Sequence, residues 1–244
     1  MRALRSYRLL VHWQALRLKG FVPLAIVVQT LFAFGIVVGY PLLFPEMDQL
    51  TMLFLATGAP AITLITMGLV ALPQVVSQAK LEGSLEYMRS LPVPRLAYLA
   101  ADLTVWMAIV LPGVAFAVLV GVWAFDLDLD VSLAIVPASL LVAVTAAAVG
   151  YAMASLLPPM IAMLMTQVLV IGVLVFSPIN FPASRLPGWL QDLHAVLPVG
   201  AMGEVIRGSL ASATFPLTAG PFVLLAAWCV VALSLSYLTL ARRA

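Results

Sequence analysis

Charge is the scarcest property of this 244-residue chain. Only 9% of its residues are Asp, Glu, Lys or Arg, whereas soluble domains carry about 25%. So few charges cannot cover the surface of a water-soluble fold, and 64% of the residues are hydrophobic. The composition therefore indicates an integral membrane protein. The net charge of +2 is too small to indicate binding to nucleic acid.

Groups that carry enzyme chemistry are missing as well. The single cysteine, Cys229, cannot form a disulfide within the chain. The sequence has no metalloprotease motif, no serine-hydrolase motif and no glycine-rich phosphate loop followed by Lys and Ser or Thr. We therefore predict no catalytic residues, no metal site and no cofactor on this chain.

Six apolar segments are long enough to cross a bilayer, which takes about 20 helical residues. They are Phe21–Leu43, Met52–Val75, Thr104–Phe125, Val131–Leu156, Pro159–Ser177 and Pro221–Leu240. These segments predict an all-α membrane protein with six transmembrane helices in a single transmembrane domain, residues 1–244. None of the segments contains Asp, Glu, Lys, Arg or His, and Asp102 falls just before the third. Ion-coupled transport usually needs such residues within spans, so a secondary transporter is disfavoured.

Basic residues gather on one side of the predicted spans. Ten of the 12 Lys and Arg residues lie in the amino-terminal segment, the loop after the second span and the carboxyl terminus. These three parts share one side if six spans alternate. Because basic loops remain in the cytoplasm, we predict a multi-pass cell-membrane protein with both termini cytoplasmic.

Residues 1–20 have the pattern of a basic amphipathic helix. On a helical wheel Arg5, Arg8, His12 and Lys19 fall within about 60° of one another. This pattern predicts an interfacial helix that lies along the inner leaflet and contacts membrane lipids. A solvated helix whose charges only fix the topology is the alternative.

Residues 76–95, after the second predicted span, contain a short amphipathic pattern. Its apolar side chains, Leu81, Leu85 and Met88, recur at helical spacing. Its charged stripe comprises Glu82, Glu86 and Arg89. We expect a bend at Gly83 and an end at the turn around Pro92. The segment is either an ordinary solvated loop or a surface on which a partner docks.

The segment 178–220, on the opposite side, contains two helices too short to span. One follows Pro187 and carries Trp189, and the other places Glu204 three residues before Arg207. We predict interfacial or re-entrant helices, which need their backbone buried in protein or facing water. Within the fifth span, Gln167 is the candidate for lining a pathway or for bonding between helices.

Two sequence motifs resemble a known family. Residues 82–86 (EGSLE) with 91–95 (LPVPR) resemble the "E-G-T-L-E … P-V-x-R" signature of type-2 ABC transporter permeases, between the second and third spans. Residues 181–190 (FPASRLPGWL) resemble the "F-P-x-x-x-L-P-x-W-L" segment before the last span. Leu197, Pro198 and Arg207 match the family's "N-P-L … x-x-x-R" pattern, with Leu in place of the usual Asn. The chain departs from the family at Ala101-Asp102, where Gly-Lys is frequent.

The resemblance implies a permease subunit of an ATP-driven exporter. A second permease copy or a related permease would join it, and two cytoplasmic ATPase subunits would carry ATP and Mg²⁺. A coupling helix would seat in each ATPase, and its residues here would be Glu82, Gly83, Ser84, Leu85, Glu86, Arg89, Pro92 and Arg95. Residues 1–20 would be the interfacial helix and 178–220 the outer re-entrant segment. The implied cargo is a hydrophobic drug or lipid, as in antibiotic efflux; haem or polysaccharide export, or a non-pumping scaffold or channel subunit, are the alternatives.

Overall fold

The computed structural model describes residues 2–43, 48–90, 93–125 and 129–241. Within these ranges the secondary structure is helical, without strands. Six helices are long and apolar enough to cross a membrane, which confirms the predicted all-α fold with six spans. Pro92 lies outside the described residues, as do Arg242 and Arg243 at the basic carboxyl terminus.

The spans account for most of the helical residues. They are α2, η1 and α3 (Phe21–Phe34, Gly35–Gly39, Tyr40–Leu43); α4, η2 and α5 (Gln49–Thr66, Met67–Ala71, Leu72–Leu81); α7 (Arg95–Phe125); α8 (Ile135–Leu156); α9 (Pro159–Phe176); and α12 (Ala219–Ala241). The shorter elements are α1 (Arg2–Leu18), α6 (Ser84–Ser90), η3 (Ala183–Arg185), α10 (Gly188–Val196) and α11 (Pro198–Leu210).

Two spans are longer than the sequence predicted. The second runs from Gln49 to Leu81, so the first part of the segment 76–95 continues the span. The third begins at Arg95 instead of Thr104. Leu, Ala and Arg favour helix, and here they extend it past the apolar core. Lys80, Arg95 and Asp102, which the sequence placed outside the predicted spans, therefore lie within these longer helices.

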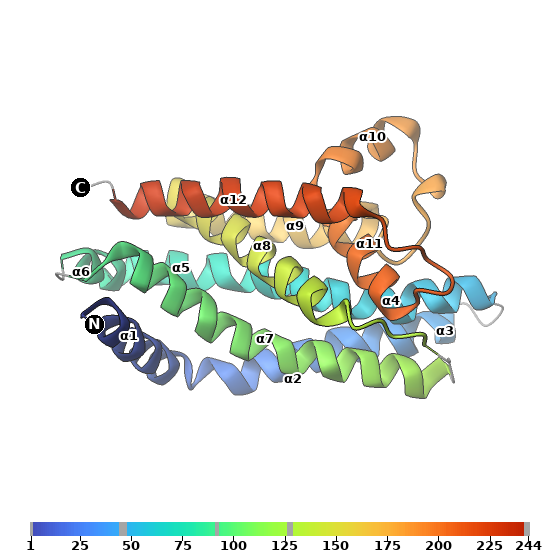
Figure 1. Cartoon of the computed structure of the whole chain (residues 1–244), viewed down its shortest axis with the longest axis horizontal. Coiled ribbons are helices and arrows are strands. Elements are labelled where there is room, and N and C mark those ends of the chain that lie inside the picture. The colour runs from blue at the N-terminus through green and yellow to red at the C-terminus, as the bar shows by residue number, and fades with distance from the viewer. Residues whose placement is uncertain (1, 44–47, 91–92, 126–128, 242–244) are drawn as a thin grey trace.

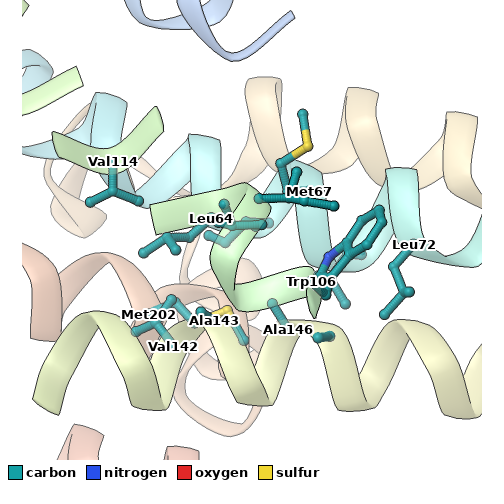
Figure 2. Packing of buried hydrophobic residues seen from close by; sticks show 14 of the residues in the cluster. Leu64, Met67, Leu72, Trp106, Val114, Val142, Ala143, Ala146 and Met202 are labelled. Carbon is teal, nitrogen blue, oxygen red and sulfur yellow. The ribbon is translucent and has the colours of Figure 1, made fainter. Parts of the chain in front are cut away.

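The second span is the centre of the bundle. It is buried along most of its length, whereas α9 and α12 leave most of their side chains exposed. It packs against α7 on one side and α8 on the other, and Figure 2 shows Leu64, Met67 and Leu72 among side chains of these neighbours. Trp106 of α7 is one of the largest side chains in this core.

Small residues allow the second span and α8 to approach closely. A Cβ at Gly150 would lie 2.1 Å from the Gly68 carbonyl oxygen, and one at Gly68 would lie 2.4 Å from Ala146 Cβ. This contact is the packing expected of small residues spaced by four in membrane helices. Gly35 and Gly39, which have the same spacing, have no such neighbour among the described residues.

The short helices and the ends of α12 lie at the two ends of the bundle. α1, α6 and the end of α12 lie at one end, and α10, α11 and the beginning of α12 lie toward the other (Figure 1). The two ends of the described chain therefore share one side, as an even number of spans requires.

Candidate functional site

The segment predicted as a coupling helix forms a separate, well-anchored helix. Gly83 has φ of +70°, a conformation that glycine adopts without strain, and it turns the chain from α5 into α6. Leu85 and Met88 of α6 are buried, while Glu82 and Glu86 are exposed. The bend lies at Gly83, where the sequence predicted it, but the predicted apolar face was wrong at Leu81, which belongs to α5 and is 63% exposed.

The apolar face of α6 lies against the ends of two spans. Leu85 and Met88 share a small enclosed space with Arg95 and Tyr98 of α7 and Leu240 of α12. A movement of α6 would therefore displace side chains at the ends of α7 and α12. The side chain of Arg89 is not among those described.

Hydrogen bonds join α6 to two further helices. Ser84 Oγ donates to the Ala79 carbonyl oxygen of α5 at 3.1 Å. Arg17 Nη2 of α1 donates to Ser84 Oγ at 3.3 Å. Ser84 thus links α1, α5 and α6 at the point where the chain turns.

A buried carboxyl group lies next to this junction. Asp102 of α7 is only 8% exposed, and it lines a small space together with Gln14 and Arg17 of α1. The Arg17 guanidinium acts electrostatically on Asp102. We call Gln14, Arg17, Ser84 and Asp102 the polar joint. Sequence reasoning missed it, although an acid at the end of an apolar span is a signal for a basic partner.

Lys80, which the sequence analysis used only to orient the spans, also has a structural role. Its Nζ donates hydrogen bonds to the carbonyl oxygens of Ala154, Ser155 and Leu157, at 2.5, 2.9 and 3.1 Å. These carbonyls end α8 and have no partner within the helix. A cation there also interacts favourably with the negative end of the helix dipole.

The basic face of α1 is exposed, as its pattern predicted. Arg5, Arg8, His12 and Lys19 all point away from the bundle core. The opposite face packs against α7 through Leu10 and Leu18, and Tyr7 Oη and Thr104 Oγ1 share a hydrogen bond of 2.8 Å. Leu4, Leu9 and Leu16 are also more than half exposed, a mixture of apolar and basic groups typical of interfacial helices.

The other end of the bundle contains a buried cation. Arg207 of α11 is only 4% exposed and donates to the Ile179 carbonyl oxygen through Nη2. Its guanidinium lies 4.0 Å from the ring centre of Phe54 and 5.5 Å from that of Phe215. Burial lowers the pKa of Arg207 to about 10, and the charge of Glu204 opposes that shift. Glu204 is exposed, and its negative charge acts on the Arg207 guanidinium electrostatically.

The remaining predicted residues of this end are exposed. Pro187 precedes the first turn of α10, and Trp189 is 69% exposed. Two contacts fasten α10: Trp228 Nε1 donates to the Val196 carbonyl oxygen at 2.9 Å, and His194 Nε2 lies 2.9 Å from the Phe176 carbonyl oxygen.

Gln167 is exposed on α9, and its neighbour Thr166 makes the contact between helices. Thr166 Oγ1 accepts a hydrogen bond of 3.1 Å from Gln74 Nε2 of the second span. An adjacent pair of polar residues in one span cannot be ranked from sequence, because only the angle of the helix decides which side chain faces inward.

Across the described ranges, no group of three or more His, Cys, Asp and Glu residues is arranged to hold a metal ion. The polar groups brought together are the polar joint at one end and Arg207 at the other. Both consist of side chains that connect helices, an arrangement suited to transmitting movement.

Comparison with known proteins identifies the chain at the level of family. No curated protein matches it significantly. Residues 4–211 match the family model described as ABC-2 type transporter, and the match includes α1, the polar joint and α11. Because the match covers far more than half of the 244 residues, the chain is a transport subunit that belongs to the ABC-2 type transporter family.

Proposed function

We propose that this chain is the membrane permease of an ATP-driven exporter and that α6 receives the force from the ATPase. The observation that supports this most strongly is the construction of α6. Exposed Glu86 lies on α6 and exposed Glu82 lies just before the Gly83 bend, while the other face of α6 is fixed to the bundle. Acidic groups on an exposed face attract a basic partner surface.

The polar joint would carry the displacement of α6 into the membrane. Arg17 contacts Ser84 at the beginning of α6 and acts on Asp102 inside α7. A push on α6 would therefore reach α1 through the Arg17–Ser84 hydrogen bond, and it would reach α7 through packed side chains and the charge of Arg17. A hydrogen bond weakens steeply when its donor and acceptor move apart. A displacement of α6 would therefore change the positions of the helices joined to it.

The rest of the assembly follows the family. Two permease chains, identical or related, would bind two ATPase subunits that hold ATP and Mg²⁺. α1 would lie at the inner surface of the cell membrane, and both termini would be cytoplasmic, as the distribution of basic residues indicates. α10 and α11 would form the outer cap.

A hydrophobic drug or lipid is the cargo we propose. Among the described residues, the buried charged side chains are Asp102 of α7 and Arg207 of α11. The other buried side chains are apolar or neutral, which suits an apolar cargo better than a sugar chain.

Purification of the tagged chain in mild detergent, with identification of bound proteins, tests the proposal. We expect a stoichiometric ATPase with a phosphate-binding loop to accompany the chain and to be lost with Glu86→Lys. Asp192→Lys makes the same charge change on an exposed residue of α10 and should retain the ATPase. Equal retention in both variants would contradict the docking role of α6.

Cargo is tested on the assembled complex in vesicles. A hydrophobic drug or lipid should stimulate ATP hydrolysis, and stimulation by haem or a polysaccharide instead would favour those exporters. Transport that continues unchanged without ATP would favour a channel-like subunit and contradict a pump.

A further inference from the structure

A cavity of about 160 Å³ lies beside Arg207 at the end of the bundle away from α6. It is formed between α11 and the beginning of α12, and Glu204, Arg207, Phe215, Thr218 and Phe222 are among its lining residues. Because a water molecule occupies about 30 Å³ of liquid, the cavity has room for a phosphate group.

Arg207 is incompletely satisfied in this position. Its partners are the neutral Ile179 carbonyl and two aromatic rings, and its Nε has no hydrogen-bond partner in the described structure. A buried cation normally pairs with an anion, because burial removes the water that would otherwise stabilise its charge. A guanidinium is also the side chain best suited to bind phosphate oxygens.

Besides Arg207, the cavity contains groups that favour an anion and one group that can bind a cation. Thr218 and Pro221 line it, so the first turn of α12 lies at its edge, where free amide N–H groups favour negative charge. Glu204 is exposed at the same cavity and supplies a carboxylate that accepts hydrogen bonds from an ammonium group. Phe215 and Phe222 provide apolar walls between these charges.

We infer that this cavity binds a zwitterionic phosphate–ammonium headgroup, with the phosphate at Arg207 and the ammonium at Glu204. A phospholipid is the favoured source. α12 begins at the cavity and exposes apolar side chains along its length, Val223 at 67% and Val230 at 65%, on which acyl chains can lie. This site needs neither ATP nor the ATPase, so it stands apart from the proposed function.

Native mass spectrometry of the purified chain tests the inference. The probes are phosphatidylethanolamine and phosphatidylglycerol with identical acyl chains, because only the first carries an ammonium group. We expect roughly tenfold stronger retention of phosphatidylethanolamine, the effect of about one charge-assisted hydrogen bond. Equal retention of the two lipids would overturn the inference.

Variants of exposed residues locate the site without disturbing the core. Glu204→Gln should abolish the preference between the lipids, while Asp192→Asn, an exposed acid on α10, should preserve it. Thr218→Trp should fill the cavity and reduce retention of phosphatidylethanolamine, with Arg207 still in place. Undiminished retention in Thr218→Trp would overturn the assignment to this cavity.

Arg207→Met should also remove the preference, but Arg207 anchors Ile179 and its loss can unfold the chain, so the Thr218 variant decides. Water-soluble phosphoethanolamine distinguishes the two possible sources. Displacement of bound lipid by the soluble compound would show that the headgroup alone is recognised. Retention of lipid in its presence would show that α12 contributes contacts to the acyl chains.

Discussion

The contact between Gly150 and the second span predicts that even one added methyl group will destabilise the bundle. In Gly150→Ala, the new Cβ would lie 2.1 Å from the Gly68 carbonyl oxygen and 3.0 Å from Pro73 Cγ. The first of these is a backbone atom of a buried helix and cannot rotate away. Helix α8 and the second span must therefore separate by about 1 Å, which loosens the packing on both sides of the contact.

Forcing additional methyl groups into a packed core costs about 1–3 kcal/mol. The magnitude in this chain can be isolated with Gly172→Ala in α9, because a Cβ at Gly172 meets no atom within 4 Å. That control gains helix propensity, up to about 1 kcal/mol, without a clash. Both variants make the same chemical change inside a helix, so their difference measures the close approach of the two helices.

Thermal unfolding in detergent, followed by tryptophan fluorescence, provides the comparison. Since 1 kcal/mol shifts Tm by about 2–4 °C in a chain of this size, Gly150→Ala should unfold about 2–12 °C below Gly172→Ala. Gly172→Ala should match or exceed the unmodified chain. A Gly150→Ala variant as stable as Gly172→Ala would refute the reasoning, because it would show that the helices do not approach as closely as described.

Three further predictions concern stability. Lys80→Met removes three bonds to the end of α8 and should cost about 1.5–3 kcal/mol in chemical unfolding, whereas Lys19→Met, at an exposed position just after α1, should change little; equal effects would contradict the capping role. Gly113→Ala would place a Cβ 1.6 Å from Gln29 Oε1 and should destabilise the chain by about 1–3 kcal/mol. Adding Gln29→Ala should restore part of that loss in a double-mutant cycle, and simple additivity would count against the clash. The Thr51 hydroxyl lowers the pKa of Asp48 below 3.8, so this carboxylate contributes stability above that pH and the contribution is lost as the pH falls through the lowered pKa; in Tm measured from pH 6 to pH 3, Asp48→Asn should show a smaller fall, and an identical fall would exclude the contribution.

Local features of the sequence were sufficient to predict the spans and the turn into α6. Span positions depend on the length of apolar runs, which is a property of consecutive residues. The bend at Gly83 was predicted from glycine in an amphipathic pattern, and the structure places it there with positive φ. The boundaries were not predicted, because residues beyond the apolar runs, including Lys80 and Arg95, continue the helices where these pack against α1, α6 and α8.

Tertiary structure alone decided which polar residues become partners. Arg17 and Asp102 are far apart in sequence, and so are Lys80 and the end of α8. No local sequence pattern could therefore predict that these groups lie close together. Glu204, three residues before Arg207, acts on it electrostatically, but only the tertiary structure places the rings of Phe54 and Phe215 beside the guanidinium. The rotation of each helix about its axis determines which side chains face inward, and that rotation is fixed only when all the helices pack together.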